Sequence, residues 1–114
     1  MTFQATTREL QGVTVIDASG SLTLGASGTV LRDLLHVMVS KGEKRFVLNL
    51  RDVHFIDSFG IGELVRSYAT VRKRGGELKL VHVTKKVQDL LEITRIHTLF
   101  EIHTDEPTGL GGFR

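Results

Sequence analysis

The spacing of apolar residues alternates between two periods along this chain, and this alternation limits the fold more than any other feature. Short runs typical of strands occupy residues 3–7, 13–16, 46–50, 78–83 and 99–102. Helical spacings of three and four residues occur between the later runs. Strands that alternate with helices predict an α/β fold, in which helices pack on a mixed sheet of about four or five strands.

The first half of the chain is expected to form a hairpin, a loop and a helix before the central strand. Gln11-Gly12 supplies the hairpin turn, and residues 20–25 carry the glycine and serine signals of a loop. A helix face follows, made of Leu31, Leu34, Leu35 and Met38. After the strand over residues 46–50, a connection over residues 51–57 is expected to point three apolar side chains inward: Val53, Phe55 and Ile56.

The clearest predicted helix follows Asp57 and ends at Gly75-Gly76, where glycine supplies the positive φ of a helix C-cap. Its apolar stripe is Ile61, Leu64, Val65 and Tyr68, and the polar residues expected to face away are Glu63, Arg66, Ser67 and Thr70. Further along, Thr84 is expected to cap a short helix whose inner residues are Val87, Leu90 and Leu91.

Length and composition predict one domain without thiol chemistry. The 114 residues suit a single core, which we assign to residues 1–106, followed by a flexible glycine-rich tail over residues 107–114. The absence of cysteine excludes a disulfide framework, a thiol nucleophile and thiolate metal ligands. No signal peptide or membrane-spanning run is recognisable, so we expect a cytoplasmic protein without membrane insertion.

Charge and histidine placement argue against nucleic-acid binding, catalysis and metal binding. The net charge is +2, and the basic clusters at residues 72–74 and 85–86 are expected to lie at solvated helix ends. The five histidines form no local ligand cluster. The nucleophile-elbow, dinucleotide-binding and phosphate-loop patterns are incomplete or absent. We therefore expect no enzyme activity, no catalytic residue, no cofactor and no metal.

Residues 57–62 form the strongest candidate site. Asp57 and Ser58 are both N-cap residue types, so the simplest interpretation is that one of them caps the helix. Gly60 and Gly62 lower helix stability there, and they would leave the backbone open for another molecule to approach. A phosphate on Ser58 would be tolerated at the positive end of the helix and would change any interface formed around an exposed Phe59.

A resemblance to a known family rests on this segment and its surroundings. It is carried by residues 47–50, by Val53, and by residues 55–62, which run Phe-Ile-Asp-Ser-Phe-Gly-Ile-Gly. Gly75-Gly76-Glu77-Leu78 and Ile93-Thr94-Arg95-Ile96 continue it. Over about residues 3–104 the chain resembles STAS domains, the module of bacterial anti-sigma factor antagonists and of the cytoplasmic part of sulfate transporters.

The resemblance implies a switchable binding protein. In the antagonists, an anti-sigma factor that is a serine kinase phosphorylates the serine after the aspartate, which corresponds to Ser58. The unphosphorylated protein binds the anti-sigma factor and frees the sigma factor for transcription. The implied partner-binding residues are Ser21, Thr23, Asp57, Phe59, Gly60, Ile61 and Gly62.

Two other functions remain open from the sequence. The chain could be a constitutive STAS scaffold in a signalling assembly or a lipid-transport ATPase complex, without phosphorylation. It could also be a sensor that binds a nucleotide or another small ligand near Ser58. Whether the chain forms a homodimer also stays open.

Overall fold

A single sheet of five strands organises the computed structural model, which describes residues 2–27, 29–104 and 110–111. The strands follow one another across the sheet in chain order: β1 (Phe3–Leu10), β2 (Val13–Leu22), β3 (Arg45–Ile56), β4 (Glu77–Val81) and β5 (Glu101–His103). β1 and β2 are antiparallel, whereas every later pair is parallel. The predicted hairpin and mixed sheet are therefore confirmed.

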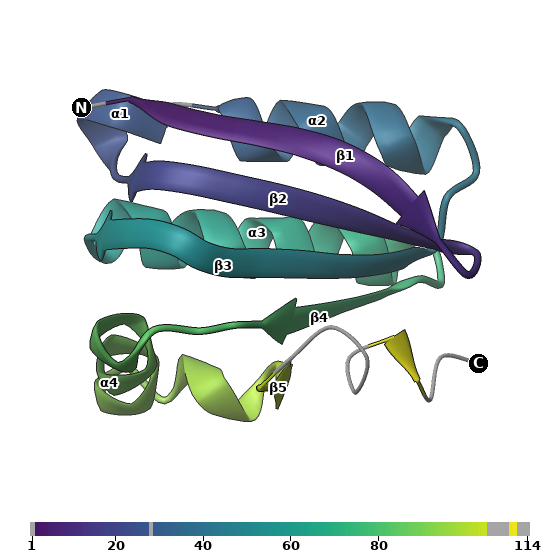
Figure 1. Cartoon of the computed structure of the whole chain (residues 1–114). Coiled ribbons are helices and arrows are strands. Elements are labelled where there is room, and N and C mark those ends of the chain that lie inside the picture. Colours follow the sequence, from purple (N-terminus) through teal and green to yellow (C-terminus); the bar gives the residue numbers. More distant parts are fainter. Residues whose placement is uncertain (1, 28, 105–109, 112–114) are drawn as a thin grey trace.

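Helical crossovers join the parallel strands and cover one face of the sheet (Figure 1). The helices are α1 (Leu24–Ser27), α2 (Val30–Ser40), α3 (Ser58–Lys73) and α4 (Lys85–Ile93), and the short 3-10 helix η1 (Ile96–Thr98) precedes β5. α2 and α3 run side by side, with α2 behind β1 and α3 behind β2 and β3 (Figure 1). The core lies between these helices and the sheet, and its largest fully buried residues include Phe46, Leu48, Leu64 and Leu80.

The opposite face of the sheet carries a smaller apolar cluster. Val13, Val15, Val47 and Val81 are buried there, and Leu110 packs against them. Lys79, on the same side of β4, donates hydrogen bonds from Nζ to the Gly111 carbonyl at 2.7 Å and to Glu101 Oε2 at 2.8 Å. Residues 110–111 of the predicted tail therefore contact the sheet, and the rest of residues 107–114 lies outside the described part.

The ends predicted for the second and third strands were wrong because strand pairing extends past the apolar runs. β2 continues to Leu22, so residues 20–22 are strand instead of loop, and residues 24–27 form α1. β3 likewise continues to Ile56 instead of ending at Leu50. The two extensions pair with each other, Ser21 beside Phe55 and Leu22 beside Ile56, and satisfy backbone groups that a loop would have left to solvent.

Two register shifts within β3 decide which side chains point inward. The pairing with β2 shifts between Asp17 and Ser19 and again between Gly20 and Ser21, and each shift adds one residue to β3. The inward set is therefore Phe46, Leu48, Leu50, Val53 and Ile56, with spacings of two and then three. The inward prediction holds for Val53 and Ile56 but was wrong for Phe55, whose side chain is 44% exposed.

The outer face predicted for α3 was also partly wrong. Glu63 and Ser67 are 1% and 0% exposed, because α2 packs against that side of α3. Glu63 Oε1 lies 3.2 Å from Arg66 Nη1 and 3.6 Å from Arg32 Nη2. Within the described residues, Glu63 Oε2 and Ser67 Oγ have no hydrogen-bond partner. Their polar character alone predicts that such residues lie at the surface. Their burial is explained by the packing of α2 against α3.

The predicted helix ends are confirmed. Gly75 follows α3 with φ +78°, a conformation that glycine adopts without strain. Thr84 Oγ1 accepts a hydrogen bond from the Val87 amide at 3.3 Å and so caps α4. Val87 and Leu91 are buried on the inner side of α4, and Leu90 packs against the core as a partly buried residue.

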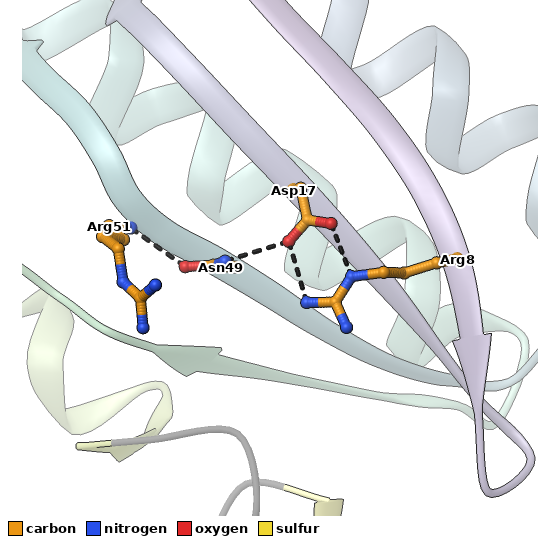
Figure 2. A network of polar contacts seen from close by, with 4 residues as sticks. All are labelled: Arg8, Asp17, Asn49 and Arg51. Atoms are coloured by element: carbon orange, nitrogen blue, oxygen red, sulfur yellow. Dashed lines mark hydrogen bonds and ion pairs between the residues drawn. The ribbon is translucent and has the colours of Figure 1, made fainter.

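A polar network crosses three strands on the face opposite α2 and α3 (Figure 2). Asp17 Oδ2 and Oδ1 accept hydrogen bonds from Arg8 Nε at 2.6 Å and Arg8 Nη2 at 3.1 Å. Asn49 Nδ2 donates to Asp17 Oδ1 at 2.9 Å, and Asn49 Oδ1 accepts from the Arg51 amide at 3.0 Å. The hydrogen bond from Arg8, and then that from Asn49, hold the pKa of Asp17 below its usual range.

We expect Asp17→Asn to destabilise the protein by about 0.5–1 kcal/mol at neutral pH, because the ion pair is partly solvated. A lowered folded-state pKa stabilises the protein above the unfolded-state pKa of about 4, and the stabilisation is lost as pH falls through the folded-state value. Urea unfolding from pH 7 to pH 2.5 should therefore show the two proteins converging in acid. A difference that persists in acid would contradict this account, and Asp89→Asn at the exposed Lys85 pair is the control.

Candidate functional site

The candidate site lies where β3 ends and α3 begins. Asp57 has an extended backbone, φ −119° and ψ −172°, and its Oδ1 accepts a hydrogen bond from the Gly60 amide at 2.9 Å. Asp57 is therefore the N-cap, and Ser58 is the first residue of α3. The sequence had allowed either residue to be the cap.

The Ser58 side chain is exposed at the positive end of a helix of 16 residues. Within the described part of the chain, its hydroxyl forms no hydrogen bond. Because Asp57 already caps the helix, Ser58 is free of that structural task. An exposed hydroxyl beside first-turn amides is accessible to a modifying enzyme, and a phosphate on it would meet a favourable helix dipole.

The two glycines of the first turn have different roles. A Cβ on Gly60 would lie 1.9 Å from the Leu22 carbonyl oxygen and 2.8 Å from Ile56 Cγ1, so Gly60 is buried and lets α3 press against the end of β2. The expectation that Gly60 leaves the backbone open to another molecule was therefore wrong. Gly62 is half-buried, and a Cβ there would meet only the Arg66 guanidinium, at 3.0 Å.

The other predicted partner contacts differ in accessibility. Phe59 is half-buried, and Ile61 is 7% exposed and packs in the core, so Ile61 holds α3 in place instead of presenting a contact surface. Ser21 is buried at the end of β2. Thr23 is half-buried, and its carbonyl oxygen accepts hydrogen bonds from the Ser27 amide at 2.8 Å and Ser27 Oγ at 2.7 Å, which begins α1.

A shallow depression lies between the end of β3 and the segment that runs from the end of β2 into α1. Ser21, Thr23 and Phe55 line it together with Gly25 and Ala26, and its volume is about 480 Å³. The register pairs Ser21 with Phe55, and Leu22 contacts the position of Gly60, so the end of β2 and the first turn of α3 lie side by side. The structure thus brings the two predicted segments, residues 21–23 and 57–62, to one edge of the sheet.

Three residues of this edge were missed by the sequence analysis. Phe55 is 44% exposed, and Lys86 Nζ lies 4.6 Å from the centroid of its ring. Leu24, in α1, is 64% exposed. For Phe55 a signal existed, because the apolar spacing in residues 46–56 changes from two to three and leaves residue 55 out of the inward set.

The histidines do not converge on a metal site. In the described residues no group of three or more His, Asp and Glu side chains is arranged to hold a metal ion. His103 Nε2 lies 2.6 Å from Glu101 Oε2, and His82 lies 3.0 Å from Arg51 Nη2. Among the helices of the described part, none is long and apolar enough to cross a membrane.

We expect Gly60→Ala to destabilise the protein by about 3 kcal/mol, because the new methyl group meets the Leu22 backbone. Gly62→Ala is the matched control one residue beyond Ile61. It should stabilise α3 by about 0.5 kcal/mol, because only the mobile end of Arg66 must move. Urea unfolding measures both values, and equal effects of the two substitutions would refute the assignment of different roles.

Comparisons with known proteins agree with this architecture. The family model described as STAS domain matches residues 4–108. The anti-sigma F factor antagonist of Paenibacillus polymyxa is 26% identical over 110 residues, which cover 96% of this chain and 94% of the relative. The anti-sigma-B factor antagonist of Bacillus subtilis (strain 168) is 31% identical over 84 residues, which cover 74% of this chain and 76% of the relative.

Solved structures show the same fold. An anti-sigma factor antagonist from Mycobacterium paratuberculosis superposes with a TM-score of 0.84 at 19% identity, covering 96% of this chain and 92% of that one. The phosphorylated form of the Bacillus cell fate determinant SpoIIAA gives a TM-score of 0.67 at 17% identity, covering 93% and 95%. With its mixed sheet, its capped Asp-Ser helix start and a family model matched over most of its length, the chain belongs to the STAS domain family.

Proposed function

We propose that this protein is an anti-sigma factor antagonist, which binds an anti-sigma factor of the serine-kinase type and is released by phosphorylation of Ser58. The observation that carries the proposal is the exposed Ser58 hydroxyl, which stands at the start of α3 next to a cap that Asp57 already supplies. Full-length similarity to a protein named as an anti-sigma F factor antagonist supports the same function.

The binding surface that we propose surrounds this hydroxyl. It combines the exposed apolar side chains of Leu24 and Phe55 with the accessible parts of Thr23, Phe59 and Gly62. Exposed aromatic residues at the centre of such a patch contribute a large part of the affinity in protein complexes. Asp57 contributes by fixing the helix start, and the buried Ser21, Gly60 and Ile61 contribute by supporting the surface from beneath.

Phosphorylation would oppose binding at this surface by electrostatics and desolvation. A phosphate adds about −1.5 to −2 charges next to the Asp57 carboxylate. The helix dipole tolerates this charge in the free protein, where water also solvates it. In a complex the phosphate would lose that water beside apolar side chains, so binding should weaken while the fold remains stable.

In this proposal the protein acts by binding. The kinase activity resides in the partner, which would transfer the γ-phosphoryl group of ATP to Ser58 Oγ. A chain without cysteine suits the reducing cytoplasm, where we place the protein.

The first test is phosphosite mapping. The chain is incubated with a serine-kinase anti-sigma factor from the same genome and ATP, and the phosphate is located by mass spectrometry. We expect phosphate on Ser58 and none after Ser58→Ala. Ser58→Asp should weaken the complex by about tenfold or more, as measured by calorimetry. Phosphate found only at other residues would refute the switch.

The second test addresses the surface without touching the serine. Phe55→Ala should weaken the complex by about tenfold or more, because the ring is an exposed apolar group at the end of β3, three residues before Ser58. Val37→Ala is the control, since Val37 is a 51% exposed apolar residue on α2, outside the proposed surface. Similar losses for both variants, or none for Phe55→Ala, would place the partner elsewhere.

The same experiments separate the switch from a constitutive scaffold. A scaffold would keep its partner when Ser58 is replaced by Ala or Asp and would lose it after Phe59→Asp. That outcome would support the proposed binding surface and would exclude regulation by phosphorylation of Ser58.

A further inference from the structure

A cavity of about 460 Å³ lies in the groove between α2 and α3, a volume within the range of small-molecule sites. Each helix lines it with one stripe of side chains at spacings of three and four residues. Arg32, His36 and Val39 come from α2, and Arg66, Ala69 and Lys73 come from α3.

The walls of this groove carry an excess of positive charge. Four of its lining residues are basic, namely Arg32, Arg66, Lys73 and Arg74, and no acidic residue is found among the described residues that line it. The carboxylate of buried Glu63 contacts two of these cations, because its Oε1 lies 3.2 Å from Arg66 Nη1 and 3.6 Å from Arg32 Nη2. Through the described ranges, neither Lys73 nor Arg74 forms an ion pair. Among the described residues, two of the four cations thus share one carboxylate and the other two form no ion pair.

Helix dipoles account for only part of this arrangement. Lys73 and Arg74 lie at the negative end of α3, where cations are favoured. Arg32 is in the first turn of α2, where the dipole disfavours a cation, and Arg66 is in the middle of α3. Glu63 compensates these two arginines only in part. A concave surface with uncompensated cations attracts anions and concentrates them.

We propose that this groove binds a small soluble molecule that carries phosphate groups. The guanidinium groups of Arg32 and Arg66 offer paired donors that match phosphate oxygens, and Lys73 and Arg74 add charge at the other end. The hydroxyls of Ser40 and Thr70 can donate further hydrogen bonds, and Val39 and Ala69 offer apolar contact to the remainder of the ligand.

This site extends away from the proposed partner surface and approaches it at Arg66, whose guanidinium lies beside Gly62. Ser58 begins α3 and Lys73 ends it, so the helix rise separates them by about 22 Å. Ligand binding in the groove can therefore be tested on the chain alone, without an anti-sigma factor.

The experiment titrates the whole chain with pyrophosphate and with ATP at constant ionic strength, using calorimetry and the amide resonances of residues 32–40 and 66–74. We expect saturable binding with a dissociation constant below about 1 mM. Thr70→Asp places a carboxylate among the cations and should weaken binding by about tenfold. Thr70→Asn, which has the size of the Asp variant but no charge, should bind more tightly than Thr70→Asp.

A second pair of variants separates local from overall charge. Lys73→Gln should weaken binding, whereas Lys85→Gln, with the same change in net charge on exposed α4, should not. The proposal is overturned if no binding saturates, or if the Asp and Asn variants behave alike. Resonance shifts confined to the start of α3 would also overturn it. So would capture by phosphatidylglycerol vesicles without binding of free phosphates, because the ligand would then be a membrane headgroup.

Discussion

The parallel pairing of β2 with β3 is the interaction on which the rest of the structure depends. It runs from Thr14 beside Phe46 to Leu22 beside Ile56, and it aligns the ends of the two strands at one edge of the sheet. There the first turn of α3 presses its Gly60 backbone against the Leu22 carbonyl. The position of Ser58 is thus fixed by strand register and a glycine contact, and not by any bond of its own side chain.

Much of the fold could be predicted from the sequence because the spacing of apolar residues indicates which side of a helix or strand is buried. The hairpin turn, the start and end of α3, the Thr84 cap and the mixed sheet follow from such local signals. The extended ends of β2 and β3 could not be predicted in this way. Their residues are polar or irregularly spaced, and they become strand only by pairing with each other.

The candidate site also combines features that local sequence signals predict with features that depend on tertiary packing. Residue types and spacing located Asp57 and Ser58 at a helix start, since capping is a local interaction. The exposure of Phe55 depends on two register shifts, and the burial of Glu63 depends on the neighbouring α2. Both are tertiary effects. The role of Gly60 was misjudged for a similar reason, because glycine permits close approach by any backbone, including that of the chain itself.

The contacts of Lys79 with Gly111 and Glu101 bear on the order in which the protein folds during synthesis. Residues 110–111 leave the ribosome after the five strands of the sheet, so Leu110 can pack on the valine cluster, and Gly111 can accept a hydrogen bond from Lys79, only after the sheet has been synthesised. The helix-covered face can consolidate earlier, because its elements all precede residue 104. A nascent chain would therefore pass through a stage with one finished face and one that still exposes apolar surface to chaperones.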